Sequence, residues 1–433
     1  MGLGRDILYG VGAVATSPIW GVSLLRTGKW RTDWAGRFGK AACGLAPDPK
    51  PDLDPTLSPK RLLLYGVSVG EINLIRNLVA ELENVPGLEL VIAASTNTGF
   101  ARATALYAER HAVVRFPYDF SFAVKRFLDR VQPDAVALVE LELWPNFMEV
   151  CASRDTPVAV INGRLTARSF RGYRKIRALI KPAFAKLNVA AVQTADYAER
   201  FTALGTPAER VEVFDTMKWD TAVVGDTVDG AEQLAAELGI DRDRPLIVAG
   251  STAPGEHQLL IETCPQDAQL LIAPRKPEWF EDVLKFAPDA VRRTATCPSA
   301  KPQAASSGRR VFLLDTIGEL RMAYSLADVC IVGRSFTGEL YGSDMMEPIA
   351  LGKPTIIGPH FADFADTMQA LTDAGGIIVS DTPGDAAAEL LQNTTMAREL
   401  ADAGRAVILS RQGSTKRHAA MLLELLQLKP SPV

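Results

Sequence analysis

The stretch LLLYGVSVGEINL, residues 62–74, decides the fold of this chain. Its apolar opening is typical of a buried strand, the small residues at 66–70 predict a turn, and the apolar spacing after Glu71 predicts a helix. These three elements form half of a βαβ unit. Because open α/β sheets bind ligands at the carboxyl ends of their strands, Glu71 is a candidate functional carboxylate. The alternative is that Glu71 only complements the helix dipole in the first turn.

Strand-like and helix-like segments alternate along the rest of the chain in two series. The expected strands lie at residues 62–67, 88–95, 112–116, 135–140, 158–161 and 189–193, then at 246–249, 270–273, 311–314, 329–332, 355–357 and 377–379. This alternation is typical of parallel, doubly wound sheets. We therefore expect two Rossmann-like domains that face each other across a cleft, with ligands entering from the carboxyl ends of both sheets.

The segments between and around these series suggest three parts, with boundaries near residues 45 and 213. Residues 1–45 form an N-terminal segment, 46–213 the first Rossmann-like domain and 214–433 the second. Residues 46–60 are rich in Pro and Asp and predict a linker, and residues 298–309 predict a surface loop. The Ala- and Leu-rich end, residues 396–428, predicts helices with a break near Gly413, and the last helix is free to pack back on the first domain.

Composition limits the classes of function. The chain has 433 residues, 47% hydrophobic and 23% charged, which is ordinary for a globular protein with a large core. A net charge of -4 gives no sign of nucleic-acid binding. The five cysteines are scattered without metal-binding spacing, which suits a reducing, cytoplasmic setting.

The N-terminal segment predicts contact with a membrane. Residues 7–25 contain no charged residue, and basic residues with tryptophans follow at once, including Arg26, Lys29 and Trp30. Tryptophans and cations beside an apolar segment suit a membrane interface. The segment could lie on the membrane or cross it once, with the basic flank on the cytoplasmic side. The alternative is an ordinary helix pair packed on a domain.

Polar residues follow several strands of the first series. Glu140 and Glu142 end a strongly apolar strand, where carboxylates are expensive unless they are hydrogen-bonded or used. Asn162 and Arg164 follow the next strand, and Arg168, Arg171 and Arg174 come close behind. This basic cluster could meet phosphates of an acceptor or of a membrane, or it could be a solvated helix face.

Residues that suit nucleotide binding follow the strands of the second series. Ser251 and Thr252 follow a strand before a helix, which is a phosphate-binding arrangement and also a plain helix cap. Further strand-end candidates are Pro274, Arg275, Lys276, Asp315, Gly318, Glu319, Ser343 and Glu347. The cations Arg275 and Lys276 suit a phosphate. Glu347 suits the hydroxyls of a ribose because an ionised carboxylate only accepts hydrogen bonds.

The order and spacing of these motifs resemble the 3-deoxy-D-manno-octulosonic acid (Kdo) transferases of lipopolysaccharide synthesis, over nearly the whole chain. The matching motifs are residues 68–71 (SVGE), 140–146 (ELELWPN), 162–164 (NGR), Lys218 with Asp220, Ser251-Thr252 with Glu256, Pro274-Arg275, Asp315, 318–320 (GEL), Glu347-Pro348 and 358–360 (GPH). The chain departs from the family pattern at Tyr65-Gly66, at Lys276 and at residues 342–346.

The resemblance implies a metal-independent, inverting GT-B glycosyltransferase without a cofactor, which moves Kdo from CMP-Kdo to the lipid A disaccharide precursor, lipid IVA. It implies that Glu71 is the general base and that Glu140 and Glu142 orient the base or the acceptor. Substrate and nucleotide contacts would come from Ser68, Gly70, Asn162, Arg164, Lys218, Ser251, Thr252, Pro274, Arg275, Lys276, Gly318, Glu319, Ser343 and Glu347. The first domain would then bind the acceptor, the second the nucleotide sugar, and the N-terminal segment the cytoplasmic face of the inner membrane.

Two other functions remain compatible with the sequence. One is a GT-B glycosyltransferase that uses another nucleotide sugar. The other is a non-catalytic, membrane-associated protein that retains the fold, although so many polar strand ends fit that alternative poorly.

Overall fold

The computed structural model describes residues 4–7, 9–11, 16, 32–40, 59–295, 310–338 and 340–428. Contacts divide the chain into a first unit, Met1–Thr221 with Gly413–Val433, and a second unit, Ala222–Gln412. The division therefore falls after Thr221 rather than after residue 213, since Met217 is buried in the core of the first unit. The expected linker at 46–60, the surface loop at 298–309 and the apolar segment 7–25 lie wholly or largely outside the described residues.

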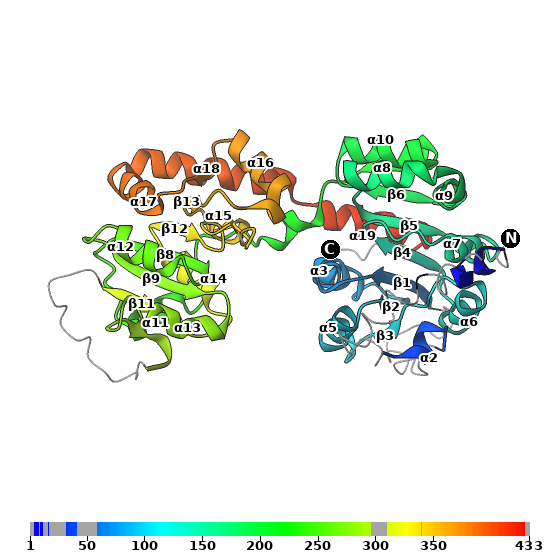
Figure 1. Cartoon of the computed structure of the whole chain (residues 1–433), viewed down its shortest axis with the longest axis horizontal. Coiled ribbons are helices and arrows are strands. Elements are labelled where there is room, and N and C mark those ends of the chain that lie inside the picture. The colour runs from blue at the N-terminus through cyan, green and yellow to red at the C-terminus, as the bar shows by residue number, and fades with distance from the viewer. Residues whose placement is uncertain are drawn as a thin grey trace. The chain divides into compact units, whose positions relative to one another are not determined.

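The first unit is a parallel sheet of seven strands in the order β3-β2-β1-β4-β5-β6-β7 (Figure 1). Its strands are β1 (Lys60–Gly66), β2 (Leu88–Ala94), β3 (Ala112–Arg115), β4 (Ala135–Val139), β5 (Val158–Gly163), β6 (Val189–Val192) and β7 (Val211–Val213). Its helices are α2 (Trp34–Arg37), α3 (Val69–Leu74), α4 (Arg76–Leu82), α5 (Asn97–Tyr107), α6 (Ser121–Val131), α7 (Pro145–Ala152), α8 (Ala167–Lys175), α9 (Arg177–Phe184), α10 (Ala195–Leu204), η1 (Ala208–Arg210), η2 (Met217–Thr221) and α19 (Ser414–Leu425).

Both faces of this sheet are covered, so its central strands are apolar throughout. Along β1, Leu63 and Tyr65 belong to one core cluster and Leu62 and Leu64 to the other. The first cluster is completed by α6, α7, α9 and α10, and the second by α3, α4, α5 and α19. Burial on both faces explains the continuous apolar runs of the sequence, because alternation appears only where one face meets water.

The second unit repeats this design in the order β10-β11-β9-β8-β12-β13-β14, again all parallel. Its strands are β8 (Leu246–Thr252), β9 (Gln269–Pro274), β10 (Val291–Arg292), β11 (Val311–Leu313), β12 (Val329–Val332), β13 (Thr355–Ile357) and β14 (Ile378–Val379). Its helices are α11 (Ala231–Leu238), α12 (His257–Thr263), η3 (Pro277–Trp279), α13 (Phe280–Val283), η4 (Arg293–Ala295), α14 (Leu320–Leu326), α15 (Met346–Ala350), η5 (Ala362–Phe364), α16 (Ala365–Asp373), α17 (Pro383–Gln392) and α18 (Thr394–Arg411).

The predicted parallel, doubly wound sheets are confirmed, and all twelve expected strands are present within a few residues. The predicted helical end with a break near Gly413 is also confirmed, since α18 and α19 flank this residue and it has φ +99°. The strands β7 and β10 were not predicted from the sequence. Both are short and partly exposed edge strands, with too few apolar residues to form a pattern.

Four of the non-glycine residues with a left-handed backbone lie near the carboxyl ends of strands. In the first unit Glu140 follows β4 with φ +62° and Asn162 ends β5 with φ +51°. In the second unit Ser251 ends β8 with φ +56° and Arg334 follows β12 with φ +59°. Such residues are uncommon, and the strain persists only where the surroundings enforce it, often at functional sites. This pattern directs attention to the same edge of each sheet.

Asn162 joins β5 to the C-terminal helix. Its backbone N–H donates to Nε2 of His418 at 3.0 Å, and its side-chain Oδ1 accepts from the N–H of Met217 at 3.0 Å. The Nδ1 atom of His418 lies 2.8 Å from the carbonyl of Ser414, which fixes the neutral tautomer with its proton on Nδ1. Burial lowers the pKa of His418 to about 4. Asp220 caps α19 by accepting from the N–H groups of Gly413 and Thr415. The helix α19 is therefore hydrogen-bonded to the first unit.

Candidate functional site

Glu71 is held at the carboxyl end of β1, in the first turn of α3. Its Oε2 accepts from the N–H of Val67 at 2.7 Å and its Oε1 accepts from the hydroxyl of Ser68 at 2.9 Å. Ser68 also caps α3. Each carboxylate oxygen keeps one lone pair, so the oriented group can still accept a proton or a hydroxyl. Burial raises the pKa of Glu71, the two hydrogen bonds lower it in part, and the charge of Glu140 raises it again.

Glu142 lies beside this carboxylate at the end of β4. Its Oε2 accepts from Nε1 of Trp144 at 2.9 Å and from the hydroxyl of Tyr65 at 3.4 Å. The hydroxyl of Tyr65 is also 2.5 Å from Oγ of Ser95. Burial raises the pKa of Glu142 to about 7, with the charges of Glu71 and Glu140 adding to the effect. Near neutral pH Glu142 is therefore partly protonated, because burial and the two neighbouring carboxylates disfavour its charge.

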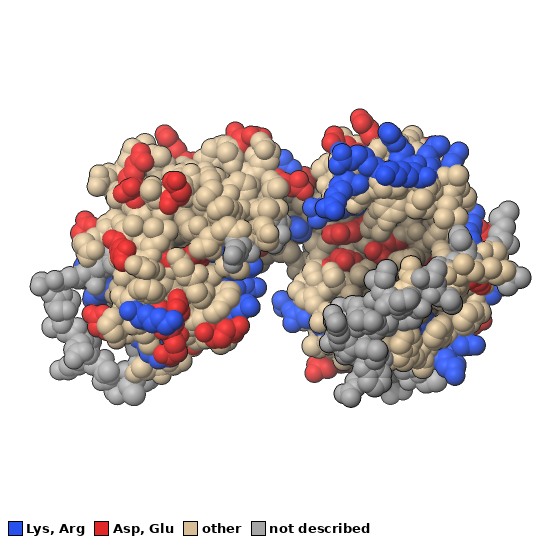
Figure 2. All heavy atoms as spheres, viewed as in Figure 1, with Lys and Arg blue, Asp and Glu red and all other residues tan. Residues whose placement is uncertain are grey.

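The three carboxylates form one acidic cluster because β1 and β4 are neighbours in the sheet. Glu140 has a left-handed backbone conformation, and its N–H donates to the carbonyl of Ile161. Figure 2 shows acidic side chains in a hollow of the first unit, with basic side chains over α8 beside them. The helix α8 has no fully buried residue, and on it burial first and then the charge of Glu142 raise the pKa of Tyr173. A basic helix thus borders the acidic cluster.

The other residues expected to bind substrate in the first unit are placed differently. Gly70 is exposed in α3, and a Cβ there would meet only the Ser68 hydroxyl at 3.7 Å. Arg164 is exposed after β5, and Lys218 is half-buried in η2. Asn162 is fully buried, and three of its polar atoms serve the fold through His418, Met217 and Gln193. Its role in the structure is to hold the backbone that presents Arg164.

The second unit contains a pocket of about 400 Å³ at the carboxyl ends of β8, β9 and β12. This volume is in the range of small-molecule sites. Five residues expected to bind the nucleotide line it: Ser251, Arg275, Gly318, Ser343 and Glu347. The remaining lining residues are Leu320, Arg321, Tyr324, Arg334, Asp344 and Phe364. Three guanidinium groups and two carboxylates make the lining suitable for an anion that also carries hydroxyl groups.

A buried carboxylate holds the loops of this pocket together. Glu256 is fully buried and accepts hydrogen bonds of 2.8–3.0 Å from the N–H groups of Ala253, Arg334, Ser335 and Phe336. It therefore links the loop after β8 to the loop after β12. Gly333 has to be glycine here, because a Cβ would lie 2.5 Å from Cα of Thr252 and 2.9 Å from the Glu256 carboxylate.

Four other expected nucleotide-binding residues do not line the pocket. Thr252 is fully buried with its hydroxyl 3.1 Å from Nε2 of His257, and Pro274 is buried at the end of β9. Lys276 is exposed, 3.6 Å from Glu278 and over the ring of Trp279. Glu319 accepts hydrogen bonds from Thr316 and Arg293. Burial alone would raise the pKa of Glu319, but these two partners lower it.

The sequence missed Arg321, Tyr324, Arg334, Asp344 and Phe364 as pocket residues. Arg321 and Tyr324 lie within two turns of Gly318 along α14, so helical spacing from that glycine was a usable signal. Arg334 directly follows Gly333 at a strand end, which was a second usable signal. No sequence pattern brings Phe364 to the pocket, since it comes from η5.

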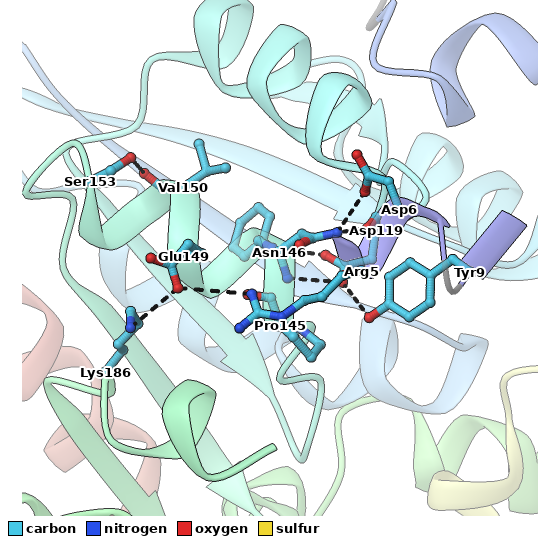
Figure 3. Close-up of polar contacts among 11 residues, drawn as sticks. Arg5, Asp6, Tyr9, Asp119, Pro145, Asn146, Glu149, Val150, Ser153 and Lys186 are labelled. Atoms are coloured by element: carbon cyan, nitrogen blue, oxygen red, sulfur yellow. Dashed lines mark hydrogen bonds and ion pairs between the residues drawn. The ribbon is translucent and has the colours of Figure 1, made fainter. Parts of the chain in front are cut away.

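Asp6 and Tyr9 are joined to the rest of the first unit by polar contacts (Figure 3). The hydroxyl of Tyr9 donates to Oδ2 of Asp119 at 3.0 Å, and Asp6 accepts from Nδ2 of Asn146 at 3.0 Å. Asp119 also accepts from the N–H groups of Asn146 and Phe147, the first turn of α7. Burial raises the pKa of Asp119 to about 6. The start of the chain is therefore tied to the helix that follows Trp144.

Exposed apolar side chains accompany this anchored start. Ile7 and Val11 are 59% and 62% exposed. Within the described ranges, no helix combines the length and the hydrophobicity that crossing a membrane requires. The same ranges contain no group of three or more His, Cys, Asp and Glu side chains placed to hold a metal ion.

Comparison with known proteins places the chain in a family. Residues 32–221 match the family model of 3-deoxy-D-manno-octulosonic-acid transferase (kdotransferase). The 3-deoxy-D-manno-octulosonic acid transferase of Haemophilus influenzae is 30% identical over 384 residues, covering 85% of this chain and 87% of that protein. The transferase of the same name from Bordetella pertussis is 30% identical over 416 residues, covering 90% and 91%. The chain belongs to the Kdo transferase family.

Solved structures agree on the fold at low sequence identity. The UDP-GlcNAc 2-epimerase of Neisseria meningitidis superposes with a TM-score of 0.54 at 12% identity, covering 84% of this chain and all of that one. The calicheamicin glycosyltransferase CalG4 superposes with a TM-score of 0.53 at 14% identity, covering 87% and 100%. The Kdo transferase chain therefore has the α/β, two-domain GT-B fold.

The raised pKa of Glu142 predicts a pH-dependent stability. With a pKa of about 7 in the folded state against 4.5 unfolded, the ionised form is disfavoured by folding, so its stabilising contribution below pH 4.5 is lost as the pH rises through 7. Glu142→Gln lacks this loss, so it should exceed wild type in free energy of unfolding by up to about 3 kcal/mol at pH 8, and by little at pH 4.5. Urea denaturation at both pH values measures the difference, with the exposed Glu81→Gln as control. A difference that does not grow with pH would contradict the assignment.

Proposed function

We propose that this protein transfers Kdo from CMP-Kdo to a hydroxyl of the lipid A disaccharide precursor, lipid IVA, with inversion and without a metal ion. The observation that carries the proposal is the orientation of Glu71: both oxygens are fixed by local donors, and both remain able to accept. Membership of the Kdo transferase family supplies the sugar that is transferred.

In the proposed reaction Glu71 removes the proton from the acceptor hydroxyl as its oxygen attacks the anomeric carbon of Kdo. The new C–O bond forms on one face while the bond from that carbon to the phosphate oxygen breaks on the other, and CMP leaves with the electron pair. A general base works best when its pKa approaches the operating pH. Burial and the charge of Glu140 move the pKa of Glu71 in that direction.

Replacement of the base tests this step. Glu71→Gln keeps the size and a hydrogen-bonding side chain but cannot take a proton, so release of CMP from CMP-Kdo in the presence of lipid acceptor should fall about 100- to 10,000-fold. Glu81→Gln, an exposed glutamate in the nearby α4, should keep wild-type turnover. Equal rates in wild type and Glu71→Gln would remove Glu71 from the mechanism.

The pocket of the second unit is the proposed site of the CMP part. Arg275 is exposed at the end of β9, and Arg321 and Arg334 line the same pocket, so a phosphate would meet three cations. Burial raises the pKa of Glu347, the positive charge of Arg321 lowers it, and the charge of Asp344 raises it. In its ionised form this carboxylate would accept the hydroxyl groups of the ribose.

Two neighbouring cations give a matched test of this pocket. Arg275 lines it, whereas Lys276 is occupied with Glu278 and Trp279 outside it. Arg275→Gln should raise the Kd for CMP about tenfold or more, since a charge-assisted hydrogen bond contributes about 1.5–3 kcal/mol. Lys276→Gln removes the same charge and should leave the Kd unchanged in calorimetry. The reverse ranking, or a preference for UDP over CMP, would contradict the proposed donor site.

The acceptor and its membrane are the proposed partners of the first unit. The exposed basic residues of α8 border the acidic cluster, so the phosphates of an acidic lipid could bind there while its hydroxyl approaches Glu71. The anchored N-terminal residues expose Ile7 and Val11, which supports docking on the cytoplasmic face of the inner membrane.

The exposed apolar side chains of Ile7 and Val11 can be replaced to test membrane docking. Replacing Ile7 and Val11 by serine keeps the contacts of Asp6 and Tyr9 and should lower co-sedimentation of the full chain with phosphatidylglycerol–phosphatidylethanolamine vesicles. Replacing Val379 and Leu409, which are 40% and 54% exposed in the second unit, by serine should have no such effect. Equal sedimentation of the two double variants would contradict docking through the N-terminus.

A further inference from the structure

The pocket of the second unit contains a polar atom that the fold leaves without a partner. Among the residues that the structure describes, seven buried side-chain N or O atoms have no hydrogen-bond partner, and of these only Oη of Tyr324 belongs to a residue that lines the pocket. Tyr324 is 1% exposed. Buried hydroxyl groups are nearly always hydrogen-bonded, so an unpaired one at a pocket calls for a ligand atom.

The chain around Tyr324 is arranged to keep this hydroxyl at the strand end. Gly250 lies where β8 reaches the pocket, and a Cβ on it would overlap Oη and Cζ of Tyr324. The absence of a side chain at Gly250 thus makes room for the phenol against the backbone. Leu320, one turn earlier on α14, would lie 2.8 Å from the same Cβ and closes the space on that side.

Two strained residues lie in the same pocket as the unpaired hydroxyl. Ser251 and Arg334 are both non-glycine residues with left-handed backbones, and both line the pocket with Tyr324. Backbone strain and an unsatisfied hydroxyl each destabilise the folded chain, and their coincidence at one pocket points to binding rather than to packing.

The charges around Tyr324 fix what the hydroxyl can do. Burial, with the charges of Glu347 and Asp344, raises the pKa of Tyr324 well above its usual value, so the group stays protonated and can donate. Arg275, Arg321 and Arg334 draw an anion into the same pocket. A donor among cations is suited to an anionic oxygen.

Building on the proposed function, we propose that Tyr324 is a donor-binding residue whose hydroxyl donates a hydrogen bond to a phosphoryl oxygen of the nucleotide. The residue would then distinguish a nucleotide from a nucleoside. Its hydrogen bond would be made only in the complex, which explains why the fold alone leaves it unmade.

Removal of the single hydroxyl tests the proposal in the full chain. Tyr324→Phe should raise the Kd for CMP about 10- to 100-fold in calorimetry, as expected for a hydrogen bond to a charged group. The Kd for cytidine, which has no phosphate, should not change. The melting temperature without ligand should stay the same or rise, because an unpaired buried hydroxyl is removed.

Tyr107→Phe is the matched control. Tyr107 is equally buried, at 3% exposure, but its hydroxyl donates to the carbonyl of Ile72 at 2.9 Å in the first unit. This variant should lose melting temperature and keep the Kd for CMP, the opposite of the result expected for Tyr324→Phe.

The outcomes separate this assignment from the proposed function. If wild type binds CMP and Tyr324→Phe binds it equally well, the assignment of Tyr324 is wrong and the donor site stands. If the variant loses affinity for cytidine as much as for CMP, the contact is to the nucleoside and the phosphoryl assignment is wrong. If wild type does not bind CMP, the proposed donor fails and the assignment fails with it.

Discussion

Burial of both faces of each parallel sheet is the constraint on which the rest of this structure depends. The central strands carry apolar side chains on each side, as in β1 and β4, so polar groups that do chemistry can appear only where a strand ends. Glu71, Glu140 and Glu142 lie at such ends in the first unit, and Ser251 and Arg275 in the second. The position of both candidate sites is therefore a consequence of the sheet itself.

Where the strands end, the chain adopts conformations or close contacts that most residues do not tolerate. At some of these positions it has a glycine, and at others a non-glycine residue with a left-handed backbone. Gly250 and Gly333 are glycines because a neighbouring group occupies the place of a Cβ. Glu140 and Arg334 keep their side chains although the left-handed backbone disfavours them. Both of these side chains belong to a candidate site, and glycine in their place would relieve the strain at the cost of the side chain.

The sequence was informative about the fold because apolar runs and turns are local. It predicted the two parallel sheets and the break at Gly413, and it missed the edge strands β7 and β10, which have too little apolar character to stand out. The motifs also placed their polar residues at strand ends, where the structure has them. They could not tell which side chain of a motif turns into a pocket: Arg275 lines one and Lys276 pairs outside it, although both follow β9.

Hydrogen-bond partners within the fold decided the positions of the remaining side chains. The hydroxyl of Thr252 lies beside Nε2 of His257, the carboxylate of Glu319 accepts from Arg293, and the side chain of Asn162 accepts from the N–H of Met217. Each of these residues is polar, follows a strand and fits a binding motif, yet each satisfies a structural hydrogen bond. Phe364 and Tyr324 show the converse, since tertiary contacts bring residues of unremarkable sequence context to the pocket.

The distribution of charge between the units suits the two proposed roles, a base in the first unit and an anion site in the second. In the first unit the described contacts of Glu71 are a backbone N–H and a hydroxyl, and its carboxylate neighbours raise its pKa. A guanidinium group in direct contact would lower that pKa and weaken the base. The cations that would bind a phosphate line a pocket of the other unit instead, together with Tyr324, a donor without charge. Because the described contacts of Glu71 are uncharged donors, its carboxylate keeps the raised pKa that its proposed task requires, while a separate pocket on the other sheet supplies the cations.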